Sequence, residues 1–237
     1  MDAARQPFGT AEERNSVGKG SPLFTPVLIA GTAAALVAAT LSPAPATPGE
    51  TPPPDGVSLE LATVSGACGS HWTSVALSGD RTEFSLFSGE FTSRVGVGSK
   101  PDESHRNCQI ALSVRVPTGY TYAIAGTDYE GHGSLEKGAR GQVRVENYFQ
   151  GTPGKSSVTH PFAGPFQGGW KEADVIFDSA LLYAPCGENR ALNLNIALRV
   201  EAGTSDTSTT RSFLTYGSTP SGAETVYHLA WKRCPAA

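Results

Sequence analysis

Charged residues are scarce in this sequence of 237 residues: Asp, Glu, Lys and Arg together make up 17% of it. With 27 Gly and 17 Pro as well, the composition excludes a long coiled coil and a highly charged disordered tail. The 18 basic residues are outnumbered by 22 acidic ones, which gives a formal net charge of −4. General electrostatics therefore draws the chain neither to nucleic acid nor to anionic lipid, and we expect no nucleic-acid partner.

The sequence motifs of several enzyme classes are also absent. The five histidines fall in no H-E-x-x-H or H-x-H pattern, and no G-x-S-x-G elbow accompanies the many serines. Gly96-Val97-Gly98 lacks the third glycine and the following helix of a nucleotide-binding loop. The cysteines form no C-x-x-C pair, which disfavours a zinc site. We predict neither a cofactor nor a metal ion, and the balance favours a non-catalytic protein.

An uncharged, largely apolar stretch lies near the N-terminus, at residues 23–41, and is followed by a small-residue site at 44–46. This pattern predicts a secretory signal peptide over residues 1–46, cleaved after Ala46. The run of 19 residues is also long enough to cross a bilayer, so a membrane anchor through residues 23–41 is the alternative. We expect a secreted, extracellular protein that keeps no membrane contact after cleavage.

Beyond the signal peptide, the sequence reads as a short linker followed by strands. Residues 47–56 hold four prolines, which cannot pair in a sheet, and we expect a stiff linker there. From residue 57 onward apolar and polar residues alternate, the pattern of strands with one buried face. We expect strands at residues 57–64, 72–78, 82–88, 91–97, 109–116, 120–126, 142–149, 174–182, 192–201, 211–216 and 225–232. Without crossover helices, these strands predict an all-β fold, a single antiparallel, jelly-roll-like β-sandwich domain over residues 57–237.

The four cysteines of this exported body are Cys68, Cys108, Cys186 and Cys234. An even number in a secreted chain favours two disulfides, with three possible connectivities. Joining Cys68 to Cys108 and Cys186 to Cys234 closes the shortest loops, and each bond would restrict the unfolded chain by roughly 4 kcal/mol. We expect this pairing to staple the sandwich, unless the order of strands in the sheets brings other cysteines together.

Eight short motifs follow one another along the body of the chain: PPPDGV at 52–57, RNCQ at 106–109, PTGY at 117–120, TDY at 127–129, FAGP at 162–165, PCG at 185–187, LNLN at 192–195 and WKRC at 231–234. In this order they resemble the secreted family catalogued as domain of unknown function 4360. The resemblance implies a secreted, cysteine-bearing, β-rich protein and supplies no catalytic residues. The family tends to have Asp-Tyr-Arg-Gly-Tyr where this chain has Asp128-Tyr129-Glu130-Gly131-His132, so any role of that Arg or second Tyr is in doubt here.

That same segment offers one candidate site. Asp128, Glu130 and His132 alternate, so on a strand their side chains would share one face. They then form either an acidic site, for a divalent cation or for hydrolysis of a sugar polymer, or merely a polar edge before a turn at Gly131 and Gly133. The polar edge is the favoured interpretation, because the Arg that the family has at position 130 would repel a metal.

Aromatic side chains offer the other candidate, a surface on which sugar rings stack. Trp170 follows Gly168-Gly169, and we expect it to lie exposed in a loop; most aromatic residues of a sandwich pack in its core instead. The remaining aromatic candidates are Trp72, Trp231, Tyr120, Tyr122, Tyr129, Tyr148 and Tyr183. Our candidate ligand-binding residues are Trp170, Asp128, Tyr129 and His132. The favoured function is non-catalytic binding of an extracellular polysaccharide or wall polymer, and the alternative is a secreted hydrolase with a site near Asp128, Glu130 and His132.

Overall fold

The structure is a computed structural model and describes residues 50–53, 55–69, 73–217 and 223–235. The predicted signal peptide, the first part of the predicted linker and Trp72 lie outside the described residues. The limits of these segments stay predictions. Across the described ranges, no helix is both long enough and apolar enough to cross a membrane.

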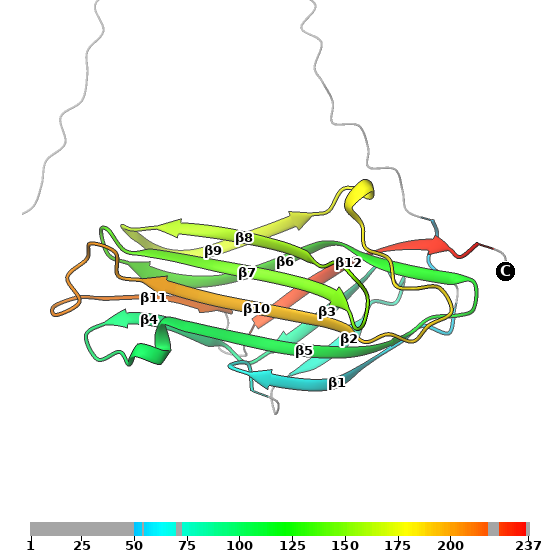
Figure 1. Cartoon of the computed structure of the whole chain (residues 1–237), viewed down its shortest axis with the longest axis horizontal. Coiled ribbons are helices and arrows are strands. Elements are labelled where there is room, and N and C mark those ends of the chain that lie inside the picture. The colour runs from blue at the N-terminus through cyan, green and yellow to red at the C-terminus, as the bar shows by residue number, and fades with distance from the viewer. Residues whose placement is uncertain (1–49, 54, 70–72, 218–222, 236–237) are drawn as a thin grey trace, which may run out of the picture. The chain divides into compact units, whose positions relative to one another are not determined.

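The described residues form two antiparallel sheets packed against each other (Figure 1). The five-stranded sheet has the order β1 (Ser58–Gly66), β5 (His105–Arg115), β10 (Leu192–Glu201), β7 (Arg140–Phe149) and β8 (Ser156–Ala163). The seven-stranded sheet has the order β2 (Ser74–Leu77), β3 (Glu83–Ser88), β12 (Ala223–Arg233), β6 (Tyr120–Leu135), β11 (Arg211–Tyr216) and β4 (Phe91–Gly96), with β9 (Phe166–Val175) also paired to β6. Two short 3-10 helices, η2 (Pro101–Ser104) and η3 (Asp178–Ala180), lie in the connections. The prediction of an all-β antiparallel sandwich is confirmed.

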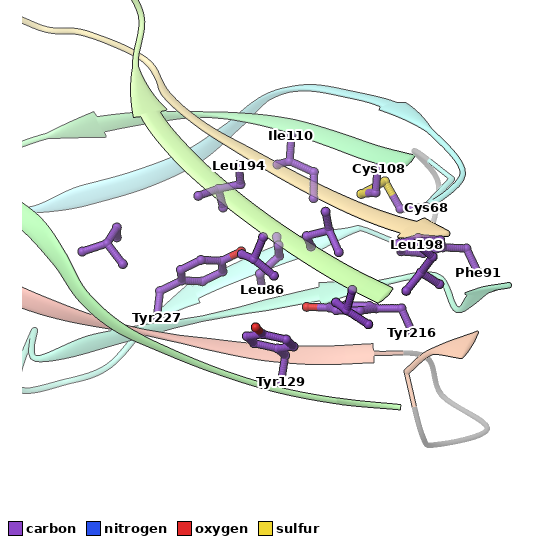
Figure 2. Packing of buried hydrophobic residues seen from close by; sticks show 14 of the residues in the cluster. Cys68, Leu86, Phe91, Cys108, Ile110, Tyr129, Leu194, Leu198, Tyr216 and Tyr227 are labelled. Atoms are coloured by element: carbon purple, nitrogen blue, oxygen red, sulfur yellow. A yellow bond between two sulfur atoms is a disulfide. The ribbon is translucent and has the colours of Figure 1, made fainter. Parts of the chain in front are cut away.

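The core lies between the two sheets, and strand β10 illustrates how the sequence places it there. Its apolar residues alternate with polar ones, and those from Leu192 to Val200 are at most 1% exposed. Figure 2 shows Leu194 and Leu198 of this strand close to the aromatic residues Tyr216 and Tyr227 of the opposite sheet. Each fully buried side chain of this size contributes roughly 1.5–3 kcal/mol, so the alternation fixes which face of each sheet turns inward.

Two strand predictions are wrong in the middle of the chain, and two strands are missing from the prediction. Strand β6 continues to Leu135 instead of ending at residue 126, and most of 174–182 is a connection containing η3. The sequence pattern does not predict β8 or most of β9. The sequence predicts a turn at Gly131 and Gly133, but both residues lie inside β6. A Cβ atom on Gly131 would lie 2.2 Å from the Trp170 ring and 2.1 Å from the Thr215 carbonyl oxygen. These glycines therefore permit close packing between neighbouring strands.

Two disulfides staple the sandwich, and their pairing is the one that closes the shortest loops. Cys68 is bonded to Cys108, which ties the end of β1 to β5, and Cys186 is bonded to Cys234, which ties the connection before β10 to the end of β12. Cys68 and Cys108 are at most 1% exposed and belong to the core (Figure 2), whereas Cys186 is exposed. The two bonds thus differ in how easily a reagent reaches them.

We expect a mild thiol reductant, applied to the folded protein, to open Cys186–Cys234 well before Cys68–Cys108. Reduction requires a thiolate to approach a sulfur atom in line, and only the exposed bond allows this without unfolding. Alkylation of freed thiols at successive times, followed by peptide mapping, measures the order. Equal rates, or earlier alkylation of Cys68 and Cys108, would contradict the expected difference in access.

Candidate functional site

Trp170 is not where the sequence places it. It lies in strand β9 and is 6% exposed, so the prediction of an exposed loop residue is wrong. Its ring packs against Phe162, Tyr216 and Tyr129, with centroid separations of 5.5, 6.2 and 6.3 Å. The physical reason is the missing side chain at Gly131, which leaves room for the indole inside the sandwich. A tryptophan enclosed in this way offers no surface to a sugar ring.

Tyr129 is also buried, and it takes part in a polar cluster between the sheets. Its hydroxyl donates a 2.9 Å hydrogen bond to Asp174 of β9, and burial together with the Asp174 charge raises the pKa of Tyr129 far above its ordinary value. His160, from β8 of the other sheet, contacts the same Asp174 at 2.8 Å and Glu172 at 3.0 Å. Both ring nitrogens of His160 thus face carboxylates, and the cluster ties the edge of one sheet to the edge of the other.

The sequence does not reveal this cluster, because His160 belongs to no recognised motif. A signal does exist once the strands are known. His160 and Phe162 alternate on the inward side of β8, and Glu172 and Asp174 alternate on the inward side of β9 with Trp170. The side chains that look polar and exposed in the sequence are thus directed between the sheets, where they satisfy one another.

Asp128, Glu130 and His132 do share one face of β6, as their alternation predicts. That face is the outer surface of the seven-stranded sheet, and each side chain has a different neighbour. His228 lies 2.7 Å from Asp128, Lys171 lies 2.6 Å from Glu130, and Glu90 lies 3.6 Å from His132. A hollow of about 470 Å³ is lined by Asp128 and Glu130 but not by His132. In the described part of the chain, no group of three or more His, Cys, Asp or Glu side chains is placed to hold a metal ion.

A different surface has the form of a binding site, and it lies on the outer face of the five-stranded sheet. Three adjoining hollows, of about 460, 510 and 120 Å³, cross this face from β8 to β1. The first two share Gln142 and Arg199, and the last two share Asn195, so they form one continuous depression. We call it the polar trough, defined by Thr63, Ser65, His105, Asn107, Gln109, Arg140, Gln142, Arg144, Glu146, Tyr148, Pro161, Asn193, Asn195, Arg199 and Glu201.

Strand pairing explains why these polar residues lie together. Asn195 of β10 is opposite Gln109 on one side and Glu146 on the other, and Arg199 is opposite His105 and Gln142. Because the alternate residues of these strands fill the core, the residues between them face outward in rows across the sheet. The three neighbouring strands β5, β10 and β7 are not consecutive in the chain (Figure 1).

Glu146 is the polar-trough residue that binds the largest number of neighbouring side chains. Its carboxylate accepts hydrogen bonds from Arg144 at 2.6 Å, from Lys155 at 2.7 Å and from Asn195 at 3.2 Å. Burial on its own would raise the pKa of Glu146, but the bonds from Lys155 and Asn195 and the charge of Arg144 together lower it below its ordinary value. Glu146 therefore stays ionised at neutral pH and holds three donor side chains in place.

The feature of the polar trough best suited to a ligand is an exposed aromatic ring. Tyr148 is 39% exposed and lies beside Asn193 at the β1 end of the polar trough. Tyr148 is one of the aromatic candidates visible in the sequence, but nothing in the sequence ranks it above Trp170. The alternation that predicts the buried leucines of β10 also marks Asn193 and Asn195 as outward.

Comparisons with known proteins agree with the motif resemblance. The family model described as Domain of unknown function (DUF4360) matches residues 55–234. A protein of Arthroderma benhamiae, described as an uncharacterized secreted protein, is 29% identical over 187 residues, which cover 78% of this chain and 75% of that protein. Among solved structures, the enzymatically active domain of tailspike protein 4 of bacteriophage CBA120 matches 73% of this chain and 19% of its own, at 8% identity. Its TM-score of 0.24 is too low to indicate a shared fold. The family match extends over most of the chain and includes both disulfides, so the chain belongs to the DUF4360 family.

Proposed function

We propose that the protein is secreted and binds an extracellular polysaccharide, without catalysis, in the polar trough. Secretion is supported by the predicted signal peptide and by the relative described as secreted. The observation that carries the binding proposal is the continuity of the three hollows, whose walls combine amide, guanidinium and hydroxyl groups with the exposed ring of Tyr148. Such groups both donate and accept hydrogen bonds, as the hydroxyls of a sugar require, while an aromatic ring covers its C–H face.

The length of the polar trough favours a polymer over a single sugar. It involves residues of all five strands, from Pro161 of β8 to Thr63 of β1. Four gaps between neighbouring strands, each of about 4.8 Å, give a span of roughly 19 Å. Because the trough is open at the surface and built on a rigid sheet, an extended chain would lie across the strands with little reorganisation of the protein.

The alternative of a hydrolase near Asp128, Glu130 and His132 has weaker support. Glycoside hydrolysis needs two carboxyl groups that face each other across the scissile bond, one of them able to give up a proton. Asp128 and Glu130 sit on one strand, and each faces a basic or histidine side chain, His228 or Lys171. The two carboxylates thus lie side by side on one strand, each paired with its own neighbour, and do not face each other across a cleft as hydrolysis requires.

A binding assay with matched aromatic variants tests the proposal. We expect the protein to sediment with at least one of chitin, β-glucan, cellulose, xylan and pectin. Tyr148→Ala should weaken that binding by about 2- to 10-fold, the effect of losing one stacked ring. Phe177→Ala is the control, since Phe177 is 78% exposed but lies outside the polar trough. Equal weakening by both variants, or no binding to any of the polymers, would contradict the proposal, and release of soluble sugars would favour the hydrolase.

A further inference from the structure

The polar trough is basic although the protein as a whole is acidic. Three arginines line it and Lys155 lies beside it, against the two carboxylates of Glu146 and Glu201. The outer face of the seven-stranded sheet has the opposite character, because the acidic residues Glu83, Asp128, Glu130 and Glu224 gather there. With a formal net charge of −4 for the chain, the positive charge of the trough is a local feature of this one face.

Within the trough, the cations are not equally available to a ligand. Arg144 is held by Glu146 and Ser157, and Arg199 pairs with Glu201 at 2.8 Å. The guanidinium of Arg140 makes no ion pair and no hydrogen bond with any described residue. It stands at the β8 end of the trough, in the hollow of about 460 Å³ that Gln142, Pro161, Arg199 and Glu201 also line.

These groups form a consistent set for one kind of ligand. A guanidinium presents two parallel N–H groups that match the two oxygens of a carboxylate. Gln142 lies opposite Arg199 in the strand register and offers an amide for a neighbouring hydroxyl, while Pro161 supplies apolar surface for the C–H groups of a sugar ring. Since Glu201 is compensated by Arg199, the hollow retains the positive charge of Arg140.

We propose that this hollow binds the carboxylate of a uronic acid, so that the polymer taken by the polar trough is an acidic polysaccharide. The inference rests on the proposed function and adds the ligand class to it. Arg140 supplies the charge-assisted contact, Gln142 and Arg199 orient the same sugar, and Tyr148 covers a sugar unit farther along the chain.

The test compares one polymer with and without its charge. We expect the wild-type protein to bind polygalacturonate about 10-fold more tightly than the same polymer with its carboxyl groups methyl-esterified, because a charged hydrogen bond is lost. Raising the salt concentration should reduce this preference and leave binding to the esterified polymer largely unchanged. Arg140→Gln should abolish the preference. Arg211→Gln should keep it, since Arg211 is an exposed arginine of the other sheet.

The possible results separate this inference from the proposed function. Equal binding of both polymers, with Tyr148→Ala weakening each, would leave polysaccharide binding standing and overturn the role of the carboxylate. Tighter binding to a sulfated polymer of similar charge density than to polygalacturonate would overturn the choice of a uronic acid. A preference unchanged in Arg140→Gln would remove Arg140 from the site, and no binding to any polymer would overturn both proposals.

Discussion

Replacing Trp170 with alanine should destabilise the protein by about 3–5 kcal/mol, the usual cost of deleting a large buried aromatic side chain. Trp170 is 6% exposed and contacts the rings of Phe162, Tyr129 and Tyr216. The free energy of unfolding of a domain is typically about 5–15 kcal/mol, so the variant should lose a large part of its stability. Urea unfolding followed by tryptophan-independent circular dichroism measures the difference.

Two further variants, Trp170→Phe and Phe177→Ala, serve as controls for this prediction. Trp170→Phe keeps most of the ring contacts and removes an indole N–H that has no hydrogen-bond partner among the described residues, so it should cost less than half as much. Phe177→Ala should change the stability by no more than about 0.5 kcal/mol, because Phe177 is 78% exposed. A loss below about 1 kcal/mol for Trp170→Ala, combined with weaker polysaccharide binding, would show instead that Trp170 lies at the surface.

The fate of Trp170 illustrates how far the sequence predicts this fold. Strands with strict alternation, such as β10, are predictable because burial of one face imposes a period of two. Glycine has two uses that the sequence does not distinguish, a turn with unusual backbone angles and a close approach between strands. Gly131 has the second use, and only the position of Trp170 on the neighbouring strand reveals it. The sequence thus predicts the sandwich but not its longest strand.

The candidate site is less predictable for a related reason. Alternation within β6 is enough to place Asp128 and Glu130 on one face, but the partner of Asp128 is His228, one hundred residues away in the sequence. The polar trough likewise depends on β10 lying between β5 and β7, an order that no local pattern encodes. Outward residues such as Asn195 and Tyr148 are visible in the sequence as single positions. Their assembly into one continuous surface requires the sheet order.

The polar trough and the polar cluster between the sheets also differ in what their charges do. In the cluster, the two carboxylates of Glu172 and Asp174 face His160, and the Tyr129 hydroxyl completes the set, so polar atoms are directed at one another. In the trough, Glu146 holds several donors, but the exposed guanidinium of Arg140 has no hydrogen-bond or ion-pair partner among the described residues. Unused hydrogen-bonding capacity at a surface depression is the mark of a binding site rather than of a structural link.

The second large effect that we expect is the loss of the buried disulfide. Replacing Cys68 and Cys108 together with alanine should cost about 4 kcal/mol, because the bond closes a loop with a sequence separation of 40. Replacing Cys186 and Cys234 frees a slightly longer loop, with a separation of 48, but the loop-entropy difference between the two is only about 0.2 kcal/mol. Chain entropy alone therefore predicts nearly equal effects for the two double variants.

The difference in burial between the two disulfides should make the stability losses of the two double variants unequal. Both sulfur atoms of the first disulfide come from residues at most 1% exposed, so alanine leaves a cavity in the core, whereas Cys186 is exposed and its replacement leaves none. We expect the Cys68→Ala/Cys108→Ala variant to be less stable than Cys186→Ala/Cys234→Ala by roughly 1–2 kcal/mol, the cost of an unfilled space of a few atoms. Urea unfolding of both variants, with the remaining disulfide verified by mass spectrometry, gives the comparison. Equal losses of stability in the two variants would mean that the core closes around the missing sulfur atoms. A larger loss for the Cys186→Ala/Cys234→Ala variant would show that the connection before β10 contributes more to stability than the junction of β1 with β5.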